Sequence, residues 1–155
     1  MKRTFLSLAA VLALSVSIAA VASAQAGGVR AHASRAAKIG LRHTAKGSIL
    51  VSSSGRTLYE FTRDHPRQNS CIRISECSAI WPALESSGSP LAASGVQASL
   101  LSTISLPGGR RQVTYAGHAL YLYSGDQGPG ETSYVGAKEF GGFWYAINAA
   151  GHPVR

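Results

Sequence analysis

The stretch TLYEFTRD at residues 57–64 recurs as ALYLYSGD at residues 119–126. A phrase repeated at a fixed offset within one chain indicates an internal duplication. The matching residues, each pair 62 positions apart, are Leu58 and Leu120, Tyr59 and Tyr121, Phe61 and Tyr123, and Asp64 and Asp126. The sequence therefore predicts two similar halves.

Short segments rich in Val, Ile, Tyr, Phe and Thr surround both copies, with Gly, Ser, Pro and Asp clusters between them. This pattern is typical of strands joined by tight turns. The first half predicts a hairpin of SILV (48–51) and TLYEFT (57–62). The second half predicts strands at LLSTISL (100–106), RQVTY (111–115) and ALYLYS (119–124). Because no segment keeps a helical period, we expect an all-β fold of antiparallel hairpins and meanders.

Each copy of the phrase is followed by a tryptophan, Trp81 in the first and Trp144 in the second, and we expect both to lie in strands. One copy alone would leave a sheet face bare, which its duplicate can cover. We therefore expect tandem repeats over about 47–90 and 98–150, packed about a pseudo-twofold axis in a single domain, residues 47–155.

Alternation along a strand puts Tyr59 and Phe61 on one face and Glu60 on the other. The glutamate indicates that the Tyr59 face is the buried one. Asp64 and Asp126 fall where the strands end, and an aspartate there caps turn N–H groups or accepts a tyrosine hydroxyl bond. The alternative, paired acids for catalysis or cation binding, requires the two carboxylates to approach each other.

The N-terminus indicates export. Lys2 and Arg3 precede an apolar run over residues 5–21, and small residues follow. These are the parts of a cleaved signal peptide, predicted over residues 1–26, with an alternative cut before Gln25. The first cysteine is Cys71, so a lipid-anchored form is not supported. We expect an extracytoplasmic protein, secreted, periplasmic or at the cell surface.

Much of the formal net charge of +8 precedes residue 47. The segment 27–46 is rich in alanine and has five basic residues and no acid: Arg30, Arg35, Lys38, Arg42 and Lys46. We interpret it as a flexible linker, with weak contact to anionic envelope components as the alternative. Because this charge lies outside the expected domain, no specific nucleic-acid binding is expected. We expect a monomer, and the sequence identifies no particular partner.

Cys71 and Cys77 are the only cysteines, and an even count in an exported chain predicts a disulfide. The alternative adds His65, which has the same spacing, to give His65, Cys71 and Cys77 as ligands of zinc or copper. That alternative would make the protein a metal- or redox-associated factor. His118 lies in the turn AGH and is expected at the surface.

Three passages together resemble a known family: LYEFTRD, the cysteine loop followed by WPAL, and QVTYAGHALYLYSGD with GGFWYAI. The sequence resembles the bacterial secreted repeat of unknown function, also described as a predicted lipoprotein with a Yx(F/W/Y)xxD motif. The motif positions are Tyr59, Phe61, Asp64, Tyr121, Tyr123 and Asp126. The resemblance implies an exported envelope protein and assigns no activity. The missing lipobox cysteine departs from the lipoprotein label.

Enzyme signatures such as GxSxG, HExxH, a P-loop or GxGxxG after a strand do not occur in the sequence. We therefore expect no enzyme activity and no cofactor, and we interpret the chain as a structural or binding module of the cell envelope. Aromatic residues of the second half are expected in the core and on half-buried sheet surface. A glycan or small-molecule groove is the alternative for Tyr115, Tyr121, Tyr123, Tyr134, Trp144 and Tyr145.

Overall fold

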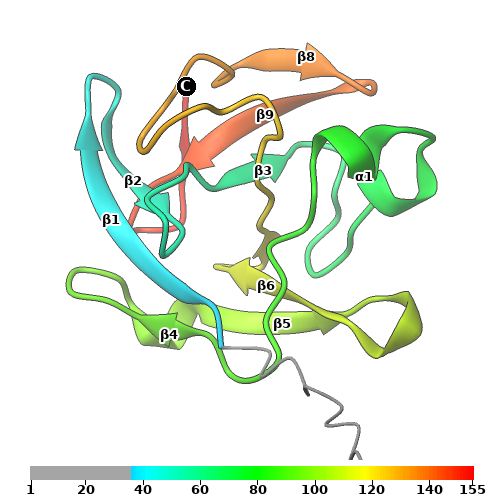
Figure 1. Ribbon diagram of the computed structural model, residues 1–155, viewed down its shortest axis with the longest axis horizontal. Helices are drawn as coiled ribbons and strands as arrows, with labels where there is room; N and C mark the ends of the chain where they lie inside the picture. Colours follow the sequence, from blue (N-terminus) through cyan, green and yellow to red (C-terminus); the bar gives the residue numbers. More distant parts are fainter. Residues whose placement is uncertain (1–35) are drawn as a thin grey trace, which may run out of the picture. The chain divides into compact units, whose positions relative to one another are not determined.

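The computed structural model describes residues 36–155 (Figure 1). This part of the chain contains ten short strands and one short α-helix, so the all-β prediction is confirmed. The predicted signal peptide and residues 27–35 of the predicted linker lie outside the described residues. The elements are β1 (Lys38–Thr44), β2 (Gly47–Val51), β3 (Tyr59–Phe61), η1 (Cys71–Arg73), α1 (Cys77–Ile80), β4 (Leu91–Ala92), η2 (Ala98–Leu100), β5 (Leu101–Ser105), η3 (Pro107–Gly109), β6 (Arg111–Tyr115), β7 (His118–Ala119), β8 (Ala137–Glu139), β9 (Gly142–Ile147) and β10 (Pro153–Val154).

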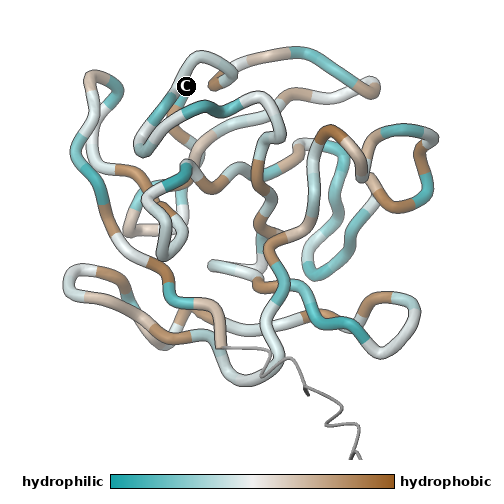
Figure 2. The backbone as a smooth tube through the Cα atoms, in the orientation of Figure 1, coloured by the Kyte–Doolittle hydropathy of each residue, from teal (hydrophilic) through white to brown (hydrophobic). Residues whose placement is uncertain are grey.

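The first sheet has the order β2-β1-β4 and includes part of the predicted linker. β1 and β2 form an antiparallel hairpin that runs from the pair Thr44 and Gly47 to the pair Gly40 and Val51. The expectation of a flexible linker up to residue 46 is therefore wrong for residues 38–44. The reason is an alternation of hydrophilic and hydrophobic residues, visible along β1 in Figure 2, which buries Ile39 completely.

The second sheet joins the two halves of the chain. Its order is β10-β9-β3, with β8 also paired to β9. β3 of the first motif runs antiparallel to β9 of the second half, so that Phe61 lies opposite Trp144. The predicted hairpin of β2 with the first motif is reduced to one bridge, between Val51 and Thr57. The main hydrogen-bonded partner of the motif strand β3 is instead β9, which belongs to the second half.

The third sheet, β5-β6-β7, is the antiparallel meander expected for the second half. Its last strand is shorter than predicted, because β7 ends at Ala119. The chain then forms single bridges at Tyr121, to Tyr59 on one side and Ala83 on the other. Most of the predicted strand ALYLYS (119–124) therefore lies between the segments that contain Tyr59 and Ala83, and it forms single bridges to them rather than a regular ladder.

The central residues of both copies of the repeated phrase are buried on both faces. Leu58 and Leu120 belong to a hydrophobic cluster with residues of β1, β2 and β6, whereas Tyr59 and Tyr121 belong to a second, aromatic cluster. All four side chains are fully buried. A strand buried on both faces is apolar on both. This accounts for the run of leucine and tyrosine at residues 120–123 in the second half.

A column of stacked aromatic rings runs through the second cluster. The two indoles are parallel, with Trp81 and Trp144 ring centroids 3.9 Å apart and an interplanar angle of 1°. Phe61 stacks on Trp144 at 4.1 Å, and Tyr123 lies against Trp81 at 4.6 Å. Each tryptophan therefore packs between the indole of its counterpart and a motif ring from the other half of the chain.

The expectation that Trp81 lies in a strand is wrong, because it follows α1 directly. Trp144 lies in β9 as expected. The indole N–H groups differ too: Trp81 Nε1 donates to Glu139 Oε2 at 3.0 Å, whereas Trp144 Nε1 has no partner among the described residues. The ring positions correspond while the backbones that carry them do not.

Replacing Trp144 with alanine should lower the free energy of unfolding by about 3–5 kcal/mol, because it removes a fully buried aromatic ring from the middle of the column. Urea denaturation followed by circular dichroism measures the loss. Trp144→Phe, which keeps a ring, should lose less and serves if the alanine variant does not fold.

The matched control is Phe143→Ala on the same strand, since the Phe143 side chain points out of the aromatic cluster and is 39% exposed. It should change the free energy of unfolding by no more than about 1 kcal/mol. Equal losses for the two variants would show that the column does not stabilise the fold.

Candidate functional site

The two motifs meet at a reciprocal backbone pair. The N–H of Tyr59 donates to the carbonyl of Tyr121 at 2.9 Å, and the N–H of Tyr121 donates to the carbonyl of Tyr59 at 2.9 Å. The turns that lead into the motifs also match, because Gly55 and Gly117 both have left-handed backbone angles, with φ values of 82° and 86°. Equivalent residues of the two copies therefore face each other at this point.

The side chains of the motifs cross over. The Tyr121 hydroxyl donates to Asp64 Oδ2 at 2.7 Å, and the Tyr59 hydroxyl donates to Asp126 Oδ1 at 3.3 Å. Burial raises the pKa of both tyrosines, so both hydroxyls remain protonated donors. Each motif aspartate is thus bound to the tyrosine of the other motif, which is one of the two roles expected from the sequence.

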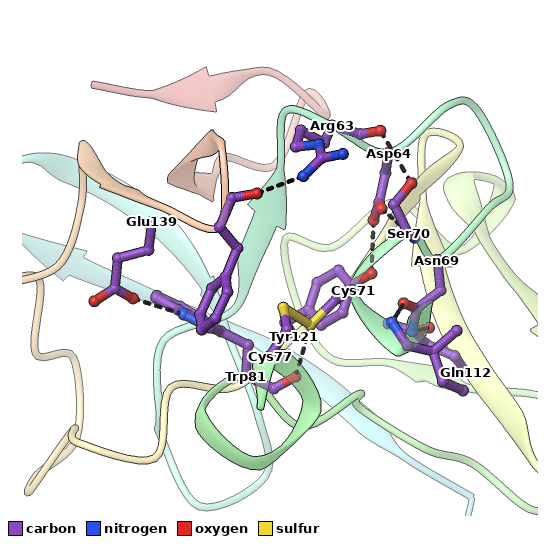
Figure 3. Close-up of a disulfide and its surroundings, with 12 residues drawn as sticks. Arg63, Asp64, Asn69, Ser70, Cys71, Cys77, Trp81, Gln112, Tyr121 and Glu139 are labelled. Atoms are coloured by element: carbon purple, nitrogen blue, oxygen red, sulfur yellow. Dashed lines mark hydrogen bonds between the residues drawn. A yellow bond between two sulfur atoms is a disulfide. The ribbon is translucent and has the colours of Figure 1, made fainter. Parts of the chain in front are cut away.

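Asp64 has a further role that Asp126 lacks. The N–H of Ser70 donates to Asp64 Oδ1 at 2.6 Å, and the Ser70 hydroxyl donates to the carbonyl of Arg63 at 3.0 Å (Figure 3). Asp64 therefore links the second motif to the start of the cysteine loop. Asp126 Oδ2, by contrast, is buried without a partner among residues 36–155.

Burial also sets the protonation of the two aspartates. It raises the pKa of Asp126 to about 6, although the Tyr59 hydroxyl opposes the shift. Burial raises the pKa of Asp64 as well, against the bonds from Tyr121 and Ser70. Both carboxyls are therefore more easily protonated than exposed aspartates.

A histidine and an arginine occupy equivalent places beside the motifs, at positions 118 and 56. The His118 ring binds the Glu60 carboxylate, whose side chain is only 6% exposed. The hydrogen bond to Glu60 raises the pKa of His118. Arg56 donates through Nη2 to the carbonyl of Tyr123. Glu60 is buried although it lies opposite the Tyr59 face, and His118 is a partner in an ion pair rather than a plain surface residue.

A small cavity of about 130 Å³ adjoins this ion pair. Its lining combines apolar and titratable residues: Glu60, Phe61, Asp64, His65, Pro66, Ala116, Gly117, His118 and Ala119. His65 lies here, but its side chain is exposed. Among residues 36–155, no group of three or more His, Cys, Asp or Glu side chains is placed to hold a metal ion.

Cys71 and Cys77 form the predicted disulfide, with their Cα atoms 5.4 Å apart. Both are fully buried in the aromatic cluster. The alternative of a metal site at His65, Cys71 and Cys77 needs two free thiolates, and the bonded sulfurs do not supply them. Figure 3 shows the disulfide beside Trp81, whose carbonyl oxygen lies 3.9 Å from Cys71 Sγ.

The start of the cysteine loop, residues 71–77, and the segment just before it form one wall of a groove of about 340 Å³. The opposite wall is the end of β5 and the turn that follows it. The lining residues are Arg67, Gln68, Asn69, Ile72, Arg73, Ile104, Ser105, Leu106 and Pro107. A smaller cavity of about 90 Å³, lined by Asn69, Ile72 and Leu106 among others, adjoins it.

Buried amides hold the loop wall in place. Gln112, which is fully buried, donates from Nε2 to the carbonyl of Leu120 at 2.9 Å. Its Oε1 accepts Asn69 Nδ2 at 2.7 Å, and Asn69 Oδ1 accepts the N–H of Ile72 at 2.8 Å (Figure 3). The groove wall is therefore tied to the backbone of the second motif.

The sequence pointed to the motif and to the cysteines, but not to the groove or to the pair of Glu60 and His118. The residues of the groove come from a loop, from the end of β5 and from the turn that follows it, and no single period relates them. A glutamate within an otherwise apolar motif strand was the one available signal for the ion pair.

Residues 102–148 match the model of a protein family described as a secreted repeat of unknown function. The match confirms the resemblance inferred from the repeated phrase, over a segment that extends from β5 to the end of β9. No curated protein and no solved structure matches the chain. In the described part of the chain, none of the helices has the length and apolar character needed to cross a membrane.

The raised pKa of Asp126 predicts that stability falls as the pH rises from about 4 to about 6. The folded state keeps this proton up to a pH near 6, whereas an unfolded aspartate loses it near pH 4. In the Asp126→Asn variant the side chain stays uncharged and its oxygen can still accept the hydrogen bond of the Tyr59 hydroxyl. The loss of stability between pH 4 and pH 6 should therefore become smaller. Asp64, whose pKa is also raised by burial, should account for part of the pH dependence that remains in this variant. Urea denaturation across this pH range measures the effect.

Glu76→Gln is the control, because the Glu76 side chain is exposed. It should leave the pH dependence as it is. A slope that is the same for the wild type and Asp126→Asn would contradict a raised pKa at this site.

The ion pair of Glu60 and His118 should stabilise the fold in acid and lose this effect as the pH rises. Because the pKa of His118 is raised by folding, its contribution is complete below about pH 6.5 and disappears as the pH passes the folded value. His118→Gln should cost up to about 1 kcal/mol at low pH and less above neutral pH. His65→Gln, an exposed histidine of the same cavity, should cost nothing at either pH, and an equal effect of both variants would exclude the pair.

Proposed function

We propose that this chain, whose residues 102–148 carry a secreted repeat of unknown function, is a non-enzymatic binding module that acts outside the cytoplasm. The observation that carries the proposal is the groove of about 340 Å³ between the cysteine loop and the end of β5. Its lining is apolar along Ile72, Ile104 and Leu106, with a few polar groups at the rim. Small-molecule sites are usually concave, mostly apolar and supplied with a few polar groups.

The groove is supported by contacts that make its loop wall rigid before a ligand arrives. The disulfide to Cys77 fixes Cys71 beside Ile72, Asp64 binds the N–H of Ser70, and Asn69 is fixed by buried Gln112. Binding loses less conformational entropy when the site is already ordered. This supports a binding role for a segment that would otherwise be a mobile loop.

The motif itself is proposed to be structural. Each aspartate is bonded to the tyrosine of the other motif, as a local twofold relation between the two repeats would require. A carboxylate engaged in this way holds two halves together and is not positioned as one of a catalytic acid pair. This supports a non-enzymatic role, with the repeats serving as a frame for the groove.

An extracytoplasmic location fits the buried disulfide as well as the family description. Disulfides persist in oxidising compartments and are rare in the cytosol. We propose a soluble, monomeric form with a cleaved signal peptide. The exposed cations of β1, Lys38 and Arg42, are proposed to give at most weak contact with anionic envelope material.

The proposal is tested with an uncharged amphiphile, n-octyl-β-glucoside, below its micelle concentration. Saturable changes are expected in the methyl NMR signals of Ile72 and Ile104 of the oxidised protein. Ile49 and Ile147, which are fully buried outside the groove, should not respond. No shifts, or shifts spread evenly over all isoleucines, would overturn the proposed site.

A variant without the disulfide, Cys71→Ser with Cys77→Ser, adds a second readout. A crosslink of this short loop contributes on the order of 2 kcal/mol, so the fold should remain and the glucoside should bind more weakly. The near-ultraviolet circular dichroism of the tryptophans shows whether the aromatic column is intact. Unchanged affinity in the variant would mean that the cysteine loop is not part of the site.

A further inference from the structure

We infer that the ligand of the groove is a small carboxylate with a short apolar body. This inference rests on the proposed function and specifies its ligand. It follows from the charge of the groove, since the lining includes Arg67 and Arg73, and no acidic residue is among the described residues that line it. Such a lining attracts an anion and repels a cation.

The two guanidinium groups are free to bind a ligand. Both arginine side chains are exposed, and within residues 36–155 neither guanidinium group takes part in a side-chain hydrogen bond or an ion pair. The guanidinium fork matches a carboxylate, which it can bind through two parallel N–H donors. Arg67 and Arg73 thus offer the donors that a carboxylate needs.

Backbone hydrogen bonds hold the main chain of both arginines beside the groove. Arg67 has a left-handed backbone with a φ of 60°, and its N–H donates to the carbonyl of Gly117 at 3.0 Å. Arg73 ends η1, where its N–H donates to the carbonyl of Ser70 at 3.1 Å. A non-glycine residue in the left-handed region is uncommon and is kept there by its surroundings. The backbone positions from which both arginine side chains extend are therefore fixed.

The apolar part of the ligand has a separate surface to cover. Ile72 comes from the loop wall and Ile104 from β5, and both are partly exposed, whereas Leu106 at the floor is 8% exposed. Covering such side chains removes apolar area from water, and this favours binding. An alkyl or aryl body between the walls would bring its carboxylate to the arginines at the rim.

The amides of the groove do not favour another class of ligand. Both polar atoms of the Asn69 side chain are already used, one with Gln112 and one with the N–H of Ile72. Gln68 is exposed at the rim and can donate to a carboxylate oxygen. A nucleic acid would need a longer basic stripe than two arginines provide.

The test compares three probes with the same eight-carbon chain: octanoate, n-octyl-β-glucoside and octylammonium. Titration followed by the methyl signals of Ile72 and Ile104 gives the three affinities at low salt. Octanoate should bind most tightly and octylammonium most weakly. Raising the salt concentration should weaken octanoate and leave the glucoside unchanged, because only the exposed charge pairs are screened.

Arg73→Gln and Arg67→Gln should each weaken octanoate about tenfold, as expected for the loss of a charged hydrogen-bond partner. Neither should change the affinity for the glucoside. The matched control is Arg111→Gln, an exposed arginine of β6 that does not line the groove. It should leave all three affinities as they are.

The outcomes separate this inference from the proposed function. Octanoate that binds no better than the glucoside, or octylammonium that binds as well as octanoate, would overturn the carboxylate ligand and leave the binding groove in place. Octanoate binding that survives both arginine substitutions would overturn the inference too. If none of the probes binds at the groove, the proposed function itself fails.

Discussion

The contact on which the rest of the structure depends is the stack of Trp81 on Trp144. Each indole comes from a different half of the chain, both are fully buried, and their rings are parallel at 3.9 Å. Burying two such rings against each other gives the halves a common core that neither half has alone. The crossed bonds of Tyr59 and Tyr121 to the aspartates then fix the orientation in which the halves meet.

Around this shared frame the two copies differ, and the candidate site lies where they differ. Asp64 holds the cysteine loop through Ser70, whereas one oxygen of Asp126 has no partner in the described part of the chain. The first copy has a buried glutamate at position 60 where the second has Leu122. The disulfide belongs to the first copy alone, and the groove lies between residues that lead into its loop and the end of β5. The crossed motif contacts hold the frame, and the proposed binding groove lies beside the copy that carries the disulfide.

The sequence predicted the all-β class and the disulfide, because each leaves a local mark: a period of two and an even number of cysteines. The two tandem repeats inferred from the repeated phrase stay a prediction. The sequence predicted the burial of Tyr59 and Phe61 as well. It did not predict that β1 belongs to the domain, since the charges of Lys38 and Arg42 concealed an alternating strand. The sequence also did not predict that Trp81 follows a helix. A tryptophan ring can reach the same stacking position from a helix end or from a strand, so the residue itself does not indicate which backbone carries it.

Local patterns in the sequence were enough to predict the all-β class, the disulfide and the buried face of Tyr59 and Phe61, because alternation along a strand is a property of neighbouring positions and the cysteines can be counted. The tertiary structure alone brings each motif tyrosine to the aspartate of the other motif and His118 to Glu60. It also places Arg67, Arg73 and Ile104 in the lining of one groove. These contacts join residues that are far apart in the chain. Their geometry depends on how three sheets pack around the stacked indoles, and no local pattern in the sequence encodes that packing.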